Sequence, residues 1–344
     1  MLPNLSMQYF IALTLVLAVA TADEFIPSAD ETTTTNIKVA LNQESMHFMV
    51  AGDFGGWPPP FYTTPTQLAV AGVMSDVASK LKPNFVLALG DNFYFLGVTD
   101  TGDERFNKTF EHVYTSPYLN IPWYPTMGNH DWHGNAHAQL DYSHVSKRWT
   151  YPWYYYTLDY TLSLSSTTIR TVMIDTTIQC GIDSKGTPIN DTVAEEQWTW
   201  IEQQLQEGQS FDYLLVVGHF PVLASGNTGP TNPCLFNRLK PLLNQYKVSA
   251  YLAGHEHNLQ HLQDATEVSD VQYFVVGCSN FVSPRFVNAD AAEFTTNFAW
   301  AEMEDLAGCF GRVEVSATSM KMVFIQARDG SEIYSYDVLP RNTQ

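Results

Sequence analysis

The stretch Phe85-Val-Leu-Ala-Leu-Gly-Asp-Asn-Phe-Tyr94 joins an apolar run to a glycine, a carboxylate and a phenol. The apolar run has the length and composition of a buried β-strand, and the glycine lets the chain turn where that strand ends. Four further segments share this design: Gly52–Gly55 (Gly-Asp-Phe-Gly), Gly128–Asp131 (Gly-Asn-His-Asp), Gly218–Pro221 (Gly-His-Phe-Pro) and Gly254–His257 (Gly-His-Glu-His). Repetition of one design along the chain predicts a single site assembled from several strand ends.

The side chains in these motifs are the kinds that bind metal ions: Asp53, Asp91, Tyr94, Asn129, His219, His255 and His257. A single Gly-Asp pair most often forms an ordinary turn, so the prediction depends on the whole set. Carboxylate, amide and imidazole donors suit zinc, manganese or ferrous iron, whereas a phenolate from Tyr94 favours a trivalent ion such as ferric iron. Two adjacent ions, with Asp91 as the natural bridge, can clamp the attacking and leaving oxygens of a phosphate ester.

Strands and helices alternate over most of the chain. Apolar runs predict strands over His47–Ala51, Phe85–Leu89, Trp123–Met127, Thr171–Ile174, Tyr213–Val217, Ser249–Ala253, Val271–Val276, Cys309–Val315 and Lys321–Gln326. Helical spacing predicts helices over Thr66–Leu81 and Leu235–Tyr246, near Phe106–Val113, and after a capping box at Thr192 and Glu195. The pattern predicts an α/β fold with sheets covered by helices and a site at the carboxyl ends of strands. We expect one catalytic domain over residues 45–344.

Composition restricts the partners and the location. The 344-residue chain has a formal charge of −19, which argues against nucleic acid or an anionic membrane as a partner. Residues 1–22 contain the apolar run Phe10–Ala20 followed by small residues, which predicts a signal peptide. No later apolar run has the length of a membrane span. Residues 23–44 are predicted to be a mobile N-terminal extension.

Entry into the secretory pathway makes the four cysteines candidates for disulfides, and Cys180, Cys234, Cys278 and Cys309 allow three connectivities. Asn107-Lys-Thr and Asn190-Asp-Thr are predicted acceptors of N-linked glycans. The expected location is therefore extracellular or lysosomal.

The sequence resembles the purple acid phosphatases, and within them the small, tartrate-resistant animal type. The five motifs occur in the order of that family, and Gly90–Val98, Ser146–Trp149 and Tyr251–Gln260 are also similar. The resemblance implies a four-layer α/β/β/α sandwich and hydrolysis of phosphate monoesters at acidic pH. It also implies a ferric ion plus divalent iron, zinc or manganese, which together would ionise a bound water in acid.

Residue roles follow from the same resemblance. The ferric ion would be held by Asp53, Tyr94 and His257, and the divalent ion by Asn129, His219 and His255, with Asp91 shared. His130 would contact the substrate and could protonate the leaving group, and Asn92 is a second predicted substrate contact. By the same correspondence Cys180 and Cys234 should pair, whereas Cys278 and Cys309 have no counterparts in the family.

Two positions depart from the family pattern. The family has a histidine, a candidate proton donor, just before Gly-Pro-Thr, and this chain has Thr228 there. Because threonine is no general acid, we predict that poor leaving groups are hydrolysed less well than activated aryl esters. His133 or His137 could substitute. Glu256 stands where the family has aspartate.

Two other functions compete with this prediction. A dinuclear zinc phosphodiesterase would need no phenolate such as Tyr94, and a secreted metal-binding protein with reduced turnover would fit Thr228. The expected partners are small phosphorylated substrates or phosphoproteins, and the expected state is a monomer. The sequence leaves the physiological substrate and the identity of the divalent metal open.

Overall fold

The computed structural model describes residues 35–301 and 307–341. The predicted signal peptide and the first part of the predicted extension lie outside the described residues. The strands within this part of the chain are β1 Asn36–Leu41, β2 Met46–Ala51, β3 Phe85–Leu89, β4 Trp123–Thr126, β5 Tyr156–Leu162, β6 Thr167–Met173, β7 Tyr213–Val217, β8 Ala250–Ala253, β9 Leu259–Asp264, β10 Gln272–Val276, β11 Phe294–Trp300, β12 Cys309–Val315, β13 Met320–Gln326 and β14 Glu332–Val338. The α-helices are α1 Pro65–Leu81, α2 Ala136–Asp141, α3 Thr176–Cys180, α4 Asp191–Glu207 and α5 Pro233–Gln245.

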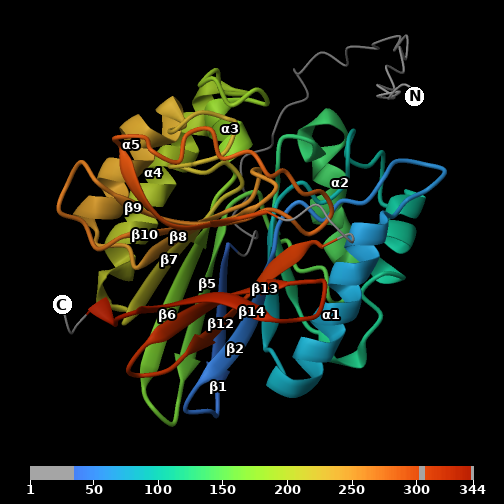
Figure 1. The fold of residues 1–344 in the computed structure, drawn as a ribbon, viewed down its shortest axis with the longest axis horizontal. Coiled ribbons are helices and arrows are strands. Elements are labelled where there is room, and N and C mark those ends of the chain that lie inside the picture. The colour runs from blue at the N-terminus through green and yellow to red at the C-terminus, as the bar shows by residue number, and fades with distance from the viewer. Residues whose placement is uncertain (1–34, 302–306, 342–344) are drawn as a thin grey trace, which may run out of the picture.

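The strands form two sheets. In the described residues, one sheet has the order β1-β5-β6-β7-β8-β10-β9-β11 and the other has the order β14-β13-β12-β2-β3-β4. Figure 1 shows α3, α4 and α5 together over the first sheet and α1 and α2 on the opposite side, beside the second. The fold is therefore the α/β/β/α sandwich that the resemblance implies.

Aromatic side chains fill the space between the two sheets. Phe85 of β3 stacks on Tyr160 of β5 with ring centroids 4.8 Å apart, and Phe274 of β10 meets the edge of Phe324 of β13 at 6.1 Å. All four side chains are almost completely buried. Such contacts give the sandwich a continuous core, because burial of large apolar side chains is the main favourable contribution to folding.

The polar motifs meet at one end of this sandwich. Strands β2, β3 and β4 run parallel, and so do β7 and β8 in the other sheet. Their carboxyl ends consequently lie at corresponding edges, where open α/β sheets build their sites. Each of the five motifs follows one of these strands.

Three predictions about elements need correction. The extension that was expected to be mobile contributes β1. This strand pairs in parallel with β5, and the pairs run from Asn36 opposite Thr157 to Leu41 opposite Leu162. Helix α4 begins at Asp191, one residue before Thr192 of the predicted capping box. Its N-cap is Asn190, which accepts hydrogen bonds from the backbone of Thr192 and Val193. The segment near Phe106 forms a single π-helical turn, Phe106–Glu111.

No helix in residues 35–301 or 307–341 is both long and apolar enough to cross a membrane.

Candidate metal centre

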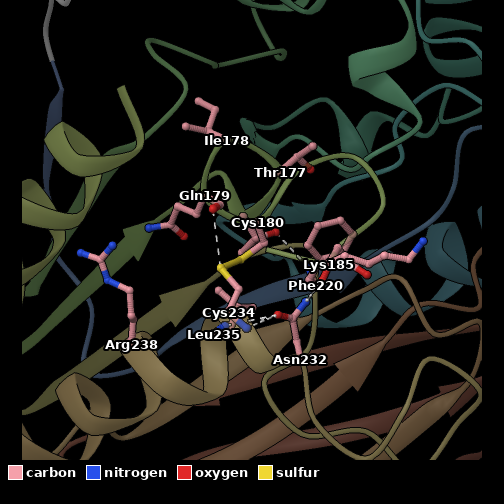
Figure 2. The surroundings of a disulfide bond; sticks show 12 residues. Thr177, Ile178, Gln179, Cys180, Lys185, Phe220, Asn232, Cys234, Leu235 and Arg238 are labelled. Carbon is pink, nitrogen blue, oxygen red and sulfur yellow. Dashed lines mark hydrogen bonds between the residues drawn. A yellow bond between two sulfur atoms is a disulfide. The ribbon is translucent and has the colours of Figure 1, made fainter. Parts of the chain in front are cut away.

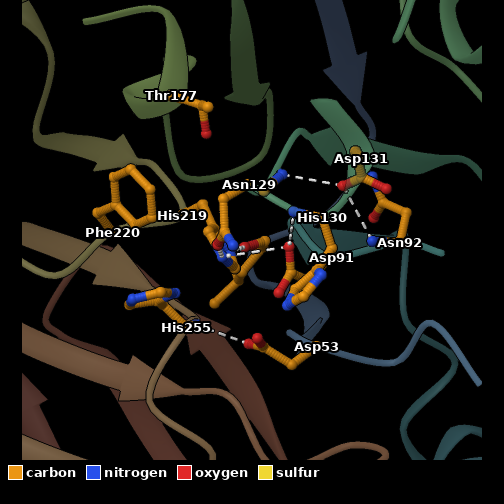
Figure 3. Close-up of polar contacts among 12 residues, drawn as sticks. Asp53, Asp91, Asn92, Asn129, His130, Asp131, Thr177, His219, Phe220 and His255 are labelled. Atoms are coloured by element: carbon orange, nitrogen blue, oxygen red, sulfur yellow. Dashed lines mark hydrogen bonds and ion pairs between the residues drawn. The ribbon is translucent and has the colours of Figure 1, made fainter. Parts of the chain in front are cut away.

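The predicted metal donors converge on one small region at the carboxyl ends of parallel strands, and Figure 3 shows Asp53, Asp91, Asn129, His219 and His255 there. Ligand atoms of Asp53, Asp91 and His219 all lie within 4.8 Å of one another. We call the seven predicted ligands the donor cluster: Asp53, Asp91, Tyr94, Asn129, His219, His255 and His257. The geometry and electrostatics of this cluster decide whether it can hold metal ions.

One half of the donor cluster surrounds a single point. The Tyr94 hydroxyl lies 2.9 Å from Asp53 Oδ1 and 2.9 Å from His257 Nε2, and His257 Nε2 lies 3.5 Å from Asp53 Oδ1. Donor atoms bound about 2.0 Å from one ion at right angles would lie about 2.8 Å apart. The observed spacing therefore fits three ligands of one ion.

The other half is organised around His219. Its Nδ1 donates a hydrogen bond to the carbonyl oxygen of Leu89 at 2.8 Å. That bond fixes the tautomer and leaves Nε2 as the ligand nitrogen. Nε2 lies 3.2 Å from the Asn129 side-chain oxygen and 3.4 Å from Asp91 Oδ1. Asp91 thus stands beside a histidine and an amide. Its carboxylate also lies within 4.8 Å of a ligand atom of Asp53 in the other half, as expected of a shared ligand.

His255 joins the two halves. Its backbone N–H donates to Asp53 Oδ2 at 2.8 Å, and its ring lies 5.1 Å from the ring of His219. Burial, followed by repulsion from a charged His219, lowers the pKa of His255 to about 3. A neutral imidazole is the form that binds a metal ion.

The cluster is electrostatically incomplete without a cation. Burial raises the pKa of Tyr94 well above its ordinary value, and the charges of Asp53 and Asp91 raise it further. A buried phenol beside two carboxylates ionises only if a strong positive charge is added. The residues therefore fit a bound cation, and the Tyr94 side suits the more highly charged ion.

Two glycines in the motifs leave room for carboxylates. A Cβ atom on Gly128 would lie 2.1 Å from Asp91 Oδ1, and one on Gly254 would lie 2.5 Å from Asp53 Oδ2. The sharp turns are made largely by the donors themselves, since Asp53, Asp91 and His255 all have positive φ. Such dihedrals are uncommon outside glycine and cluster at functional sites.

Buried polar residues behind the cluster fix its loops. Asp131 accepts hydrogen bonds from the backbone of Asn92, Phe93 and Gly128. Arg105 donates to the carbonyl oxygens of Gly55, Tyr94 and Gly97. Sequence reasoning missed Arg105, which stands beside Asp103 and Glu104 and looks like part of a charged surface.

The predicted substrate contact at Asn92 is wrong. Its side chain is completely buried, and its amide donates to the Thr126 carbonyl at 2.9 Å and to Gln139 at 3.1 Å. The side chain therefore has a structural role, holding the loop after β3 against the end of β4 and against α2.

His130 lies at the open side of the cluster. Its backbone N–H donates to Asp91 Oδ1 at 3.0 Å, and its Nδ1 donates to the carbonyl oxygen of Phe95 at 2.9 Å. Nε2 is thereby left free to contact a substrate. His133 and His137 are the two predicted substitutes for the missing histidine. The ring of His133 lies 5.9 Å from the ring of His130. His137 instead contacts Tyr154 and Asp141.

Aromatic rings form one wall beside the cluster. Phe281 packs against Tyr94 with centroids 4.9 Å apart and against Phe95 at 5.8 Å, and Trp57 touches both Phe95 and Phe281. Trp57 is 38% exposed and Phe95 37%. This aromatic wall therefore faces solvent next to His130.

A polar pocket borders the cluster at His255 and forms a second wall. It is lined by Ser184, Pro221, Ala224, Thr228, Gly229, Thr231, Asn232, Pro233 and the donor His255. Apart from Pro233 at the start of α5 and the donor His255, these residues come from two loops, 181–190 and 221–232, which we call the rim. The disulfide Cys180–Cys234 ties the two loops together (Figure 2), which confirms the predicted pairing.

The second disulfide, Cys278–Cys309, was left open by the sequence. It connects the loop after β10 to the start of β12 and so joins the two sheets. Asn107 and Asn190 are both exposed, and their glycosylation stays a prediction.

The fold and the donor cluster are those of a metal-dependent phosphoesterase. A model of the family described as calcineurin-like phosphoesterase matches residues 46–259. Tartrate-resistant acid phosphatase type 5 from Sus scrofa is 36% identical over 337 residues, covering 96% of each chain. The Homo sapiens protein of the same name is 38% identical over 291 residues, covering 82% of this chain and 88% of its own.

The chain therefore belongs to the calcineurin-like phosphoesterases and, within them, to the small animal type of purple acid phosphatase. Phosphoester hydrolysis at a metal centre is the chemistry that family and site support. A solved structure described as GAP50, the anchor in the inner membrane complex of Plasmodium, is similar in fold. Its TM-score is 0.74 at 21% identity, covering 87% of this chain and 90% of that one.

Proposed function

We propose that this protein hydrolyses phosphate monoesters at acidic pH, with ferric iron and a divalent iron, zinc or manganese ion in the donor cluster. The observation that carries the proposal is the convergence of Tyr94, Asp53 and His257 on one point. A phenolate among these donors favours a trivalent ion, and a trivalent ion is what would keep the site active in acid.

The chain's own residues divide the work. Asp53, Tyr94 and His257 would hold the ferric ion, and Asn129, His219 and His255 the divalent ion, with Asp91 between them. When bound, the ions supply an ionised water and neutralise charge that develops on the phosphate. His130 Nε2, set free by the hydrogen bond from Nδ1 to Phe95, can hold a proton for the leaving oxygen.

Solvent access supports one direction of approach for a substrate. Asp53, Asp91, Tyr94 and His219 are buried, whereas Asn129, His130, His255 and His257 are partly exposed. A substrate would therefore approach from the side of the partly exposed residues, between the aromatic wall and the rim. We propose small phosphorylated molecules or phosphoproteins as substrates and a monomeric, secreted or lysosomal enzyme. Two disulfides fit an oxidising compartment.

A visible absorption spectrum tests the metal assignment. Protein loaded with iron should be purple or pink because a phenolate bound to ferric iron absorbs visible light, and Tyr94→Phe should remove the band. Tyr251→Phe is the matched control, since that buried tyrosine bonds to the Phe220 carbonyl and not to the cluster. A colourless, iron-free preparation with full activity would refute the ferric assignment.

Turnover of phenyl phosphate between pH 4 and pH 8 tests the activity. We expect a maximum on the acidic side, and a loss of at least about 10²-fold in kcat for His130→Ala with metal content unchanged, the usual size of a lost proton donor. Preferential cleavage of a diester such as bis-nitrophenyl phosphate would favour the phosphodiesterase alternative. Metal binding without turnover of either ester would favour the binding protein.

A further inference from the structure

Glu256 lies between two residues of the donor cluster but bonds to neither. Its carboxylate accepts hydrogen bonds from the rim: Oε2 from the Asn227 backbone at 3.2 Å, and Oε1 from the Thr228 backbone at 2.8 Å and the Thr228 hydroxyl at 2.5 Å. The side chain is only 3% exposed. A buried carboxylate with several donors aimed at it fixes those donors strongly.

The tip of the rim loop is built around this carboxylate. A Cβ atom on Gly226 would lie 2.0 Å from Glu256 Oε2, so only glycine fits there. Asn288 holds the same tip from the other side, donating to the Gly226 carbonyl at 2.6 Å. The position of Thr228 is therefore set by its contact with Glu256 within a closely fitted loop.

This contact shapes the polar pocket. Thr228 and Gly229 form part of the pocket wall, and His255 of the donor cluster forms another part. Ser184 and Thr231 also line it, and within residues 35–301 and 307–341 neither of their hydroxyl groups has a hydrogen-bond partner. Hydroxyl groups without protein partners beside a metal ligand are suited to an alcohol-bearing ligand.

We propose that Glu256 and Thr228 act as one positioning unit, which shapes the pocket as a subsite for hydroxylated leaving groups of phosphate esters. This proposal rests on the proposed phosphatase function. The two departures from the family pattern are thus a single change, because each residue is the partner of the other. Replacing Thr228 by histidine alone would also remove the bond to Glu256, so the two positions must be exchanged together.

Steady-state kinetics with two esters and one inhibitor test the unit. Glycerol phosphate carries a hydroxylated leaving group, phenyl phosphate can use the aromatic wall, and inorganic phosphate as inhibitor contacts only the metal side. Glu256→Gln and Thr228→Val should each raise KM for glycerol phosphate by about 10-fold, the size of a lost hydrogen bond to a charged group. KM for phenyl phosphate and Ki for phosphate should change by less than about 2-fold, within the usual effect of a neutral surface change.

Coupling is tested by the double variant. Glu256→Gln with Thr228→Val should cost no more than the larger of the two single changes, since Thr228→Val removes the hydroxyl donor and Glu256→Gln weakens the acceptor of the same contact. The pair Glu256→Asp with Thr228→His should give a lower KM for glycerol phosphate than either of its single changes. Thr199→Val, on an exposed face of α4, is the matched control and should match the wild type.

Three results would overturn the proposal. Ki for phosphate rising in parallel with KM would mean that Glu256 acts on the metal ligands. Additive effects in the double variant would mean that the residues act independently. If metal-loaded wild type cleaves neither ester, the proposed function fails, and calorimetric titration with glycerol phosphate still tests the pocket: equal affinity of wild type and Thr228→Val refutes it.

Discussion

The donor cluster and the rim are neighbours that are held in place by different means. Apart from Asn129, which follows the edge strand β4, the cluster residues follow strands whose backbones are paired on both sides, for example β3 between β2 and β4. The rim consists of loops held by side chains, by the Cys180–Cys234 bond and by Glu256. His255 belongs to the cluster and also lines the pocket, so the two regions meet there. The chemistry is thus built on rigid strand ends, while selectivity is left to loops that can vary.

The largest expected effect is the loss of the shared ligand. Asp91→Asn should remove bound metal and lower kcat by more than about 10³-fold, beyond the 10–100-fold typical of residues that only support a ligand. Metal content by atomic emission and turnover of phenyl phosphate measure it. Asp183→Asn, on the exposed part of the rim, is the matched control. If Asp91→Asn kept both metals and half its activity, the division between cluster and rim would be wrong.

The two disulfides offer a second way to test whether the donor cluster and the rim are held in place by different means. Replacing Cys180 and Cys234 by serine opens a link across 54 residues and should lower the free energy of unfolding by about 4 kcal/mol. We expect metal content and colour at 25 °C to be unchanged, because this bond belongs to the rim. Denaturant unfolding and the visible spectrum are the measurements.

The second disulfide is the counterpart of the first. Cys278–Cys309 spans 31 residues, so its removal should cost slightly less, still near 4 kcal/mol. It joins the sheets next to Gly52, whose carbonyl accepts a hydrogen bond from Ser279 at 3.3 Å. Here the loss of stability should be accompanied by weaker metal retention. If the two double-serine variants retained metal equally well, the donor cluster and the rim would not be held in place independently of each other.

The cluster could be predicted from sequence and the rim could not, for physical reasons. An apolar strand followed by glycine and a donor is a local pattern, and five copies of it identify one site. Edge strands such as β14, whose residues are nearly all exposed or partly exposed, lack the apolar run and are not predicted. The Glu256–Thr228 contact joins residues 28 positions apart, and nothing local in either segment signals it. Arg105 was missed for a related reason, since its bonds go to backbone carbonyls, which any sequence provides.

The smallest expected effect concerns pH and α3, the helix that leads into the rim. Asp175 caps α3, which leads to Cys180, and accepts hydrogen bonds from Thr177 and Ile178. Burial raises its pKa from 3.8 to about 7, so between these values the folded state holds a proton that the unfolded state lacks. Stability from this group therefore falls as pH rises, by up to about 1.4 kcal/mol per unit.

His261 of β9 should act in the opposite direction. It lies buried in the sandwich beside Phe274, and burial lowers its pKa from 6.5 to about 4. Between these values the unfolded state holds the extra proton, so stability from this group falls as pH falls, again by up to about 1.4 kcal/mol per unit. From pH 4 to pH 6.5 the two slopes largely cancel.

Single variants separate the two slopes. Asp175→Asn should make the free energy of unfolding rise more steeply with pH over this range, whereas His261→Gln should make it rise less steeply or fall. Denaturant titrations at half-unit intervals of pH measure the slope, which does not depend on how much either change costs at a fixed pH. If both variants keep the wild-type slope, neither group changes its proton occupancy on folding. If only Asp175→Asn changes the slope, the pH dependence of the free energy of unfolding arises at α3, which leads into the rim, and not in the core between the sheets.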